Sequence, residues 1–440
     1  MSKNKLITIN SEVESAFLIG VEFHNHPNIL PLLDSLNELT LLAQTAGLKV
    51  VGQSTQKLDK PNPATFIGSG KVEEIKILAE EAQSNIILFD DELSPRHIRE
   101  LEEKFGNRIR ILDRTALILD IFGQHAHTAE GKLQVELAQY EYLYPRLTRA
   151  WTHLARQAGG SSGRSGSRVG VGLRGPGEMQ LEVDRRRIQK RMTVIKNKLE
   201  KVCQHRKQYR QYRKKNQLPI IALVGYTNAG KSTLINQITN ANVLVADQLF
   251  ATLDPTTRRV VLPGGNPALI TDTVGFIQKL PPQLIVSFRA TLEEISEADL
   301  LIHVVDITHP SARLQYHVVL ETLNEIGVKD IPIITVLNKI DQNQHWHETI
   351  RTTPEFLEGL AISALTGEGV DELLMRITQE LFESFTTVTV NLPYKEGFLI
   401  SMFHQNGNLL KVEHGTEGVI LKGDLPKRLI PKYTPFLINK

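Results

Sequence analysis

Hydrophobic and polar positions follow two different periods along the first 115 residues. Short apolar runs predict strands, and between them apolar residues recur at helical spacing. Ser94 with Pro95 marks a helix start and Gly106 a helix end. The predicted strands are Ala16–Glu22, Leu48–Val51, Ile86–Phe89 and Arg108–Leu112, and the predicted helices are Pro31–Ala46, Lys71–Gln83 and 95–105. Strands that alternate with helices imply a parallel sheet with crossover helices, so residues 1–115 are expected to form an N-terminal α/β domain.

Residues 116–217 change to a helical period alone. One apolar stripe consists of Leu133, Leu137, Tyr140 and Tyr144, and a second consists of Ile188, Met192, Ile195, Leu199 and Val202. The second stripe has heptad spacing, which is used when two helices pack side by side. Between the stripes, residues 159–177 are too rich in glycine and arginine to hold a helix or a core. The segment is predicted to be an antiparallel helical hairpin with a mobile basic loop at 159–177.

Residues 218–385 return to alternating strands and helices. Their near-continuous apolar runs are typical of strands buried on both faces and are Ile220–Val224, Ala268–Thr271, Leu300–Val305 and Ile331–Leu337. In residues 386–440 short strands are predicted at Thr387–Asn391, Gly397–Phe403 and Gly418–Lys422. The fold class is therefore α/β: a mostly parallel sheet in 218–385, preceded by a small α/β domain and a long helical hairpin and followed by a small α+β domain.

Composition narrows the class of protein. With 41% hydrophobic and 23% charged residues among 440, the chain is neither largely disordered nor collagen-like. The one cysteine, Cys203, excludes an internal disulfide and a cysteine-cluster metal site. Apolar runs are far shorter than the ~20 residues that span a bilayer. We expect a cytoplasmic monomer without membrane insertion, and peripheral membrane association stays open.

The net charge of +2 conceals a strong asymmetry. Residues 146–215 hold 20 Lys and Arg against 4 Asp and Glu, a net charge of +16, which leaves −14 on the rest of the chain. Such asymmetry indicates a polyanionic partner. The basic residues are mainly arginines, interleaved with tyrosines and Trp151, and arginine suits phosphates and stacked bases. RNA is the favoured partner, and a solvated helix face is the alternative.

A phosphate-binding motif follows the strand Ile220–Val224 and opens a helix. It matches G-x-x-x-x-G-K-[ST] and comprises Gly225, Tyr226, Thr227, Asn228, Ala229, Gly230, Lys231 and Ser232, with Thr233 next. The glycines let backbone N–H groups turn around phosphate oxygens, Lys231 supplies a point charge, and the Ser232 hydroxyl suits Mg²⁺. A chance glycine turn is disfavoured by the strand before it and the helix after it.

Three further segments come at strand ends and decide which nucleotide is bound. The first is Asp272, Thr273, Val274 and Gly275, where a magnesium-orienting aspartate and a γ-phosphate-sensing glycine would lie. The other two are Asn338, Lys339, Ile340 and Asp341, and Ser363, Ala364 and Leu365. An aspartate in the second segment can accept from N1–H and the 2-amino group of guanine, a donor pair that adenine lacks. GTP and GDP are therefore predicted as ligands rather than ATP.

With these motifs the chain resembles the translation-factor class of GTPases and, within it, the HflX family of ribosome-associated GTPases. The resemblance rests on residues 250–257, 272–276, 172–178, 181–186 and 131–138, covers about residues 15–385 and is faint in the last ~50. It implies a switch-one threonine, Thr252, that joins Ser232 on Mg²⁺, and further nucleotide contacts from Phe250, Ala251, Leu253 and Asp254. It also implies that the hairpin reaches the peptidyl-transferase region of the large ribosomal subunit, in ribosome splitting or rescue under stress and in large-subunit maturation.

Hydrolysis of GTP by water is assigned to Lys231, Thr252, Asp272 and Gly275. Phe276 stands where a water-positioning glutamine often follows, so intrinsic hydrolysis should be slow until a partner or another residue completes the site. Asn228 is similar to an asparagine that coordinates K⁺ in related GTPases, which makes K⁺ a candidate cofactor. Two alternatives stay open: a tRNA-modification GTPase, which would need a catalytic cysteine or a cofactor pocket, and a non-hydrolysing RNA-binding scaffold.

Overall fold

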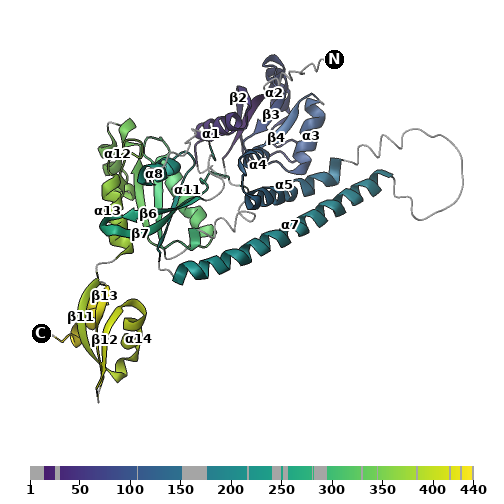
Figure 1. Ribbon diagram of the computed structural model, residues 1–440. Helices are drawn as coiled ribbons and strands as arrows, with labels where there is room; N and C mark the ends of the chain where they lie inside the picture. Colours follow the sequence, from purple (N-terminus) through teal and green to yellow (C-terminus); the bar gives the residue numbers. More distant parts are fainter. Residues whose placement is uncertain are drawn as a thin grey trace, which may run out of the picture. The chain divides into compact units, whose positions relative to one another are not determined.

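The computed structural model describes residues 14–24, 30–106, 108–150, 176–215, 218–239, 249–250, 256–279, 281, 295–328, 331–343, 345–382, 385–415, 418–426 and 429–438. The chain divides into two compact units, Met1–Val260 with Leu269–Glu368 and Val261–Ala268 with Gly369–Lys440, and each is described by itself (Figure 1). Within the described residues, no helix has the length and apolar character needed to cross a membrane.

The N-terminal sheet has four strands in the order β2-β1-β3-β4, and all its paired neighbours are parallel. Its strands are β1 (Ser15–Phe23), β2 (Lys49–Leu58), β3 (Ile86–Phe89) and β4 (Arg110–Asp113), and its helices are α1 (Leu32–Thr45), α2 (Ser69–Glu81), α3 (Pro95–Phe105) and α4 (Arg114–His125). Helix α3 begins where predicted, because the Ser94 hydroxyl accepts from His97 N, and it ends at Gly106 with φ 83°. The predicted parallel α/β arrangement is confirmed.

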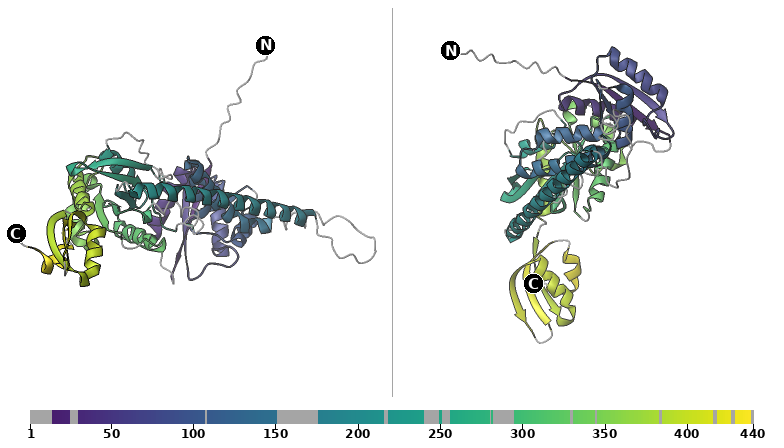
Figure 2. Two further views of the ribbon diagram at one scale, coloured as in Figure 1. Left: turned by 60° about the horizontal axis from the view of Figure 1, so that its bottom comes forward. Right: turned by 90° about the vertical axis from the view of Figure 1, so that its right-hand side faces the viewer.

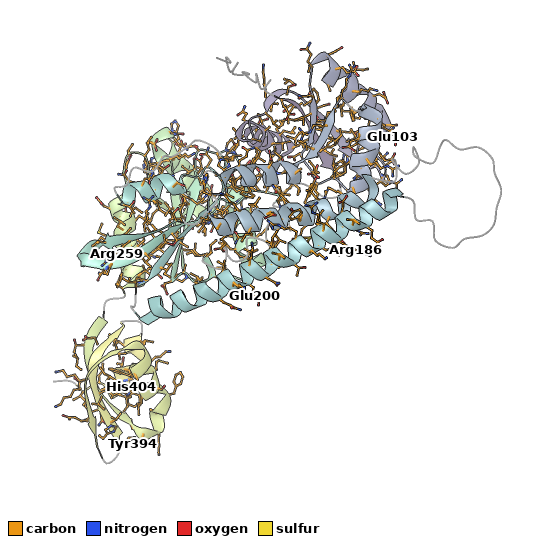
Figure 3. All side chains as sticks on the ribbon, turned by 45° about the vertical axis from the view of Figure 1, so that its right-hand side comes forward. Glu103, Arg186, Glu200, Arg259, Tyr394 and His404 are labelled. Atoms are coloured by element: carbon orange, nitrogen blue, oxygen red, sulfur yellow. The ribbon has the colours of Figure 1, made fainter. Side chains whose placement is uncertain are left out.

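Two long helices, α5 (Ala129–Ala150) and α7 (Pro176–Lys215), run side by side (Figure 2). We call this pair the helical arm. The heptad stripe on α7 is its less exposed face, with Ile195 fully buried, whereas Arg186 and Glu200 are exposed (Figure 3). Ion pairs join the helices at Arg191–Glu136 (2.8 Å) and Lys196–Glu141 (2.9 Å). The antiparallel hairpin is confirmed, while loop residues 159–175 lie outside the described residues.

The second large sheet has six strands in the order β10-β9-β8-β5-β7-β6. Its strands are β5 (Ile220–Gly225), β6 (Thr256–Leu262), β7 (Asn266–Asp272), β8 (Leu300–Asp306), β9 (Ile333–Asn338) and β10 (Leu360–Ala361), and the helices of this region are α8 (Lys231–Thr239), α11 (Ala312–Glu325) and α12 (Trp346–Thr352). The next helix, α13 (Val370–Leu381), belongs to the second unit. The pairs β5–β7, β5–β8, β8–β9 and β9–β10 are parallel. Consequently their carboxyl ends meet at one edge of the sheet, where the sequence motifs lie.

One apolar cluster connects the N-terminal domain, the helical arm and the second sheet. It includes Leu36 of α1, Phe122 of α4, Ala138 of α5 and Val224 of β5, all less than 2% exposed. Because they share one core, these parts pack against one another and are not independent domains joined only by linkers. The strand ends that carry the motifs are therefore close to N-terminal side chains.

The C-terminal part is a three-stranded antiparallel sheet, in the order β11-β13-β12, with helix α14 packed against it (Figure 1). Its elements are β11 (Phe385–Pro393), α14 (Gly397–Asn406), β12 (Asn408–His414), β13 (Gly418–Pro426) and α15 (Ile430–Tyr433). The strand predicted at Gly397–Phe403 is wrong, because this segment is the first part of α14. A short unbroken apolar run carries no period that separates a buried strand from a helix. Here Phe403 is buried and Phe398 is 73% exposed, as the two faces of a helix require.

Candidate active site

The phosphate-binding motif forms the turn between β5 and α8, which we call the P-loop (Gly225–Ser232). Gly225 and Gly230 both have positive φ, 155° and 94°. A Cβ at Gly230 would lie 2.2 Å from Nδ2 of Asn338, and one at Gly225 would lie 2.3 Å from the carbonyl oxygen of Val304. Only glycine fits at either position, because any side chain would collide with the adjacent strand ends.

Lys231 begins α8 with its ammonium folded back into the P-loop. Nζ donates to the carbonyl oxygens of Gly225 (3.1 Å) and Tyr226 (2.8 Å). Burial lowers the pKa of Lys231 to about 8, and the charge of Asp272 opposes this shift only in part. Beneath it lies His303 on β8, a neutral ring stacked on Tyr316, because burial and then the charge of Lys231 lower the pKa of His303 to about 3. The lysine is thus a desolvated cation, the state in which it attracts a phosphate most strongly.

Ser232 and Asp272 bring two oxygen ligands together beside the lysine. The Ser232 hydroxyl donates to Oδ2 of Asp272 at 2.7 Å, although the two residues are 40 positions apart. Hydroxyl and carboxylate oxygens are the hard ligands that Mg²⁺ prefers. These two side chains therefore fit a magnesium ion, which would be shared with the phosphates of a bound nucleotide.

The segment after Asp272 lies directly over the P-loop. Phe276 N donates to the carbonyl oxygen of Gly225 (3.0 Å), and Thr227 N donates to the carbonyl oxygen of Phe276 (2.8 Å). A Cβ on Gly275 would lie 2.9 Å from Cα of Thr227 and 3.0 Å from Nζ of Lys231. Phe276 itself is 3% exposed and belongs to the core. The backbone of Phe276 is therefore bonded through both its N–H and its carbonyl group to the first residues of the P-loop.

The predicted base-binding segments meet at the ends of β9 and β10. Asn338 donates to the carbonyl oxygen of Ala229 (2.8 Å) and accepts from Ala364 N (2.9 Å), which ties both segments to the P-loop. Ser363 is buried, whereas Asp341 is exposed. Lys339 pairs with Asp306 at 2.7 Å, a contact that the sequence does not predict. The Asp306 carboxylate also accepts from Thr308 N.

Several predicted contact residues are buried in the core, strongly exposed, or outside the described residues. Ala251, Thr252, Leu253 and Asp254 are not among the described residues. Phe250 is buried against Phe122 of α4, with ring centroids 4.6 Å apart, and Ile340 is 6% exposed. Leu365 is 70% exposed. The roles assigned to these residues stay predictions.

A buried cluster of charges adjoins the P-loop and was not found from the sequence. Arg114 of α4 is 1% exposed and pairs with Glu38 of α1 and with Asp90 after β3 (2.7 Å). The Tyr226 hydroxyl donates to Glu38, and burial raises the pKa of both groups. Lys279 joins the cluster at 2.8 Å from Asp90. No sequence signal predicts these contacts, because the partners are separated by 24 to 189 positions.

The basic residues of the helical arm divide into bound and outward-facing groups. Arg146 is drawn into the fold: its guanidinium lies 3.4 Å from the centroid of the Tyr142 ring and donates to the Leu93 carbonyl at 2.8 Å. It is therefore not available to a polyanion. The exposed basic residues of α7 include Arg186, Arg187, Lys190, Lys198 and Lys201, whereas Lys196, although exposed, is paired with Glu141 of α5.

Four family profiles together match most of the chain. They are described as GTP-binding GTPase N-terminal (residues 33–123), GTP-binding GTPase Middle Region (125–213), 50S ribosome-binding GTPase (220–339) and HflX C-terminal domain (353–423). The third covers the P-loop and the Asn338 segment, and the second covers the helical arm.

Curated relatives are similar over nearly their whole length. The GTPase HflX of Caldanaerobacter subterraneus subsp. tengcongensis is 43% identical over 92% of this chain and 91% of its own, and that of Escherichia coli is 42% identical over 89% and 88%. Among solved structures, a GTP-binding protein from Sulfolobus solfataricus in complex with GDP is 24% identical over 84% of this chain and 99% of its own, with a TM-score of 0.43.

Proposed function

Because the chain belongs to the HflX family and is a GTPase, we propose that it binds the large ribosomal subunit in its GTP state through the helical arm. In this proposal the loop between α5 and α7 enters rRNA at the peptidyl-transferase region. The outcome is the splitting or rescue of stalled ribosomes under stress, with a second role in maturation of the large subunit.

The single observation that carries the proposal is the outward-facing charge of α7. Glu136 and Glu141 of α5 each form an ion pair with α7, so they do not neutralise the other basic residues of that helix. Exposed Arg and Lys side chains extend along α7 toward the loop. A rigid basic rod suits a phosphate-lined channel, and a glycine- and arginine-rich loop can adapt to RNA at its end. The rest of the chain carries −14, so the arm is the part that RNA attracts.

In this proposal the chain's own residues have the following parts in GTP hydrolysis. Lys231 binds the β- and γ-phosphates, Asn338 holds the P-loop and the Ser363–Leu365 segment together, and Asp341 is exposed where it can accept from guanine. Ser232, Asp272 and Thr252 would hold Mg²⁺, which neutralises phosphate charge when bound. Asn228, with φ 59°, is the residue that would hold K⁺.

Hydrolysis is proposed to need the ribosome. Phe276 has no polar side-chain atom to orient water, and in this structure its ring is buried in the core. Turnover of GTP should therefore be slow alone and rise steeply when purified large subunits are added. Equal turnover with and without subunits would contradict this part of the proposal.

The role of the arm is tested by co-sedimentation with large subunits in GDP, GTP and a non-hydrolysable GTP analogue. Deleting 159–177 should abolish binding while GDP affinity stays unchanged. The double substitution Arg186→Glu/Arg187→Glu should weaken binding, and its matched control is Lys60→Glu/Arg96→Glu, the same charge change on exposed residues of the N-terminal domain. Retained co-sedimentation after the deletion, or equal loss in the control, would refute the assignment.

A further inference from the structure

Strained backbone gathers at the nucleotide site. Six non-glycine residues among those described have positive φ, and four of them lie in or beside the nucleotide motifs: Asn228, Phe250, Lys279 and Lys339. Phe250 and Lys279 flank the two segments that should respond to the γ-phosphate, before 251–255 and after Asp272–Gly275. Both have φ in the left-handed region, 59° and 53°, which a bulky side chain adopts only when its surroundings hold it there.

What holds these two residues is the N-terminal domain. The ring of Phe250 packs on Phe122 of α4. The Lys279 ammonium lies 2.8 Å from Oδ2 of Asp90 and 2.6 Å from Oδ1 of Asp91, at the end of β3. Its side chain is 24% exposed and that of Asp90 is fully buried, so solvent screens this contact little.

The backbone between Gly275 and Lys279 is attached at each step. Phe276 is paired with Gly225 and Thr227 of the P-loop. Gln278 N donates to the Tyr226 hydroxyl at 2.9 Å, and its side-chain amide donates to the Ser35 hydroxyl of α1 at 2.6 Å. Lys279 then closes the segment on Asp90 and Asp91. Lys279 and the backbone that covers the P-loop thus belong to one continuous bonded segment. A change at Lys279 should therefore shift Phe276, three residues away.

This covering backbone lies close to the P-loop and its lysine. Thr227 N donates to the Phe276 carbonyl oxygen, and a Cβ on Gly275 would lie 3.0 Å from Nζ of Lys231, so only a glycine backbone fits beside the ammonium. P-loop N–H groups and the lysine are the groups that bind phosphates. GDP needs less of this space than GTP, because GDP lacks the γ-phosphate and the γ-phosphate is the group that the Asp272–Gly275 segment contacts.

We propose that Lys279 is a positioning residue for the GTPase reaction. By pairing with Asp90 and Asp91, Lys279 keeps Gly275–Gln278 packed against the P-loop. Binding of a γ-phosphate requires these ion pairs to break. The N-terminal domain thereby sets the preference of the site for GDP over GTP. The proposal concerns the isolated protein and does not depend on where the ribosome binds.

The test compares affinities of the full chain for GDP and for a non-hydrolysable GTP analogue, with fluorescent nucleotides and no ribosomes. Lys279→Ala removes the ion pairs but keeps a Cβ in the strained conformation, so the segment should move away from the P-loop. The ratio of analogue affinity to GDP affinity should then rise by at least about fivefold, the lower end of the coupling usual between two sites. Lys279→Gly relieves the strain as well and should raise the ratio less. Lys279→Arg should restore most of the wild-type ratio.

Two further variants separate positioning from simple damage. Asp91→Asn weakens the same anchor from the other domain, and its effect should not add to that of Lys279→Ala, because both remove one contact. Lys71→Ala removes a lysine–carboxylate pair in the N-terminal domain whose lysine is similarly exposed (16%), although its Glu74 partner is more exposed than Asp90 and Asp91, and should leave the ratio unchanged. An unchanged ratio in a folded Lys279→Ala protein, parallel loss of both affinities, or full additivity with Asp91→Asn would each overturn the proposal.

Discussion

Nucleotide binding should draw a proton into the site at mildly alkaline pH. Burial lowers the pKa of Lys231 to about 8 in the nucleotide-free protein. A bound phosphate keeps the ammonium charged, so a lysine that is neutral before binding must take up a proton when GDP binds. At pH 7 only about 0.1 proton is required, whereas at pH 8.5 the requirement is about 0.8.

The same linkage sets the size of the effect on affinity. Between pH 7 and pH 8.5 the affinity for GDP should fall by about fourfold, since the fraction of Lys231 that is charged falls by this factor. The sign for folding is opposite: a lysine with a lowered pKa is destabilising when charged, so the nucleotide-free protein gains stability as pH rises from about 8 toward the unfolded value near 10.5. Above about pH 8, therefore, the affinity for GDP falls while the free energy of unfolding of the nucleotide-free protein rises.

Isothermal titration of GDP in two buffers of different ionisation enthalpy measures the proton uptake directly. Titration of GDP into protein-free buffer subtracts the heat of dilution, and Lys71→Ala is the control for loss of an unrelated lysine. Uptake should rise from about 0.1 to about 0.8 proton between the two pH values. Equal uptake at pH 7 and pH 8.5, with a flat affinity, would refute the reasoning that burial has lowered the pKa of Lys231.

Three further predictions concern the N-terminal charge cluster and the P-loop. Arg114→Ala should lower the free energy of unfolding by about 3–5 kcal/mol, because Glu38 and Asp90 stay buried without their cation, whereas Arg110→Ala, whose pair with Glu14 is solvent-exposed, should cost under about 1 kcal/mol in urea unfolding. Gly230→Ala should abolish GDP binding, since its Cβ would displace the Asn338 amide; Gly70→Ala, with no atom within 4 Å of the new Cβ, should bind GDP normally. If Asn228 holds K⁺, GTP turnover should be faster in K⁺ than in Na⁺ at equal ionic strength, and equal rates would exclude this role.

The parts of the site that the sequence predicts are those fixed by local rules. The P-loop spacing and the position of Asn338 at a strand end need only a parallel sheet, because its carboxyl strand ends meet at one edge. Helix α3 follows in the same way from Ser94, Pro95 and Gly106. The heptad spacing likewise identifies correctly the less exposed face of α7.

Other contacts could not be predicted, because they arise only when distant segments pack. Glu38 reads as a polar position on the helix that became α1, yet it is 8% exposed and bonded to Tyr226, 188 positions away. Arg146 reads as one more RNA-binding arginine, whereas packing places it on Tyr142. Helix α14 was mistaken for a strand because seven apolar and small residues in a row show no period.

The P-loop is held from three directions, and the contacts differ in whether they come from the segment that should respond to the γ-phosphate. Asn338 donates to the carbonyl oxygen of Ala229, at the end of a neighbouring strand. Glu38 accepts from the hydroxyl of Tyr226, which in turn accepts from Gln278 N. Phe276 directly follows Gly275 and is bonded to Gly225 and Thr227. The Asn338 contact is therefore independent of the Gly275–Gln278 segment, whereas the other two are not. A substitution at Asn338 should thus weaken GDP and GTP alike, whereas one at Lys279 should separate them.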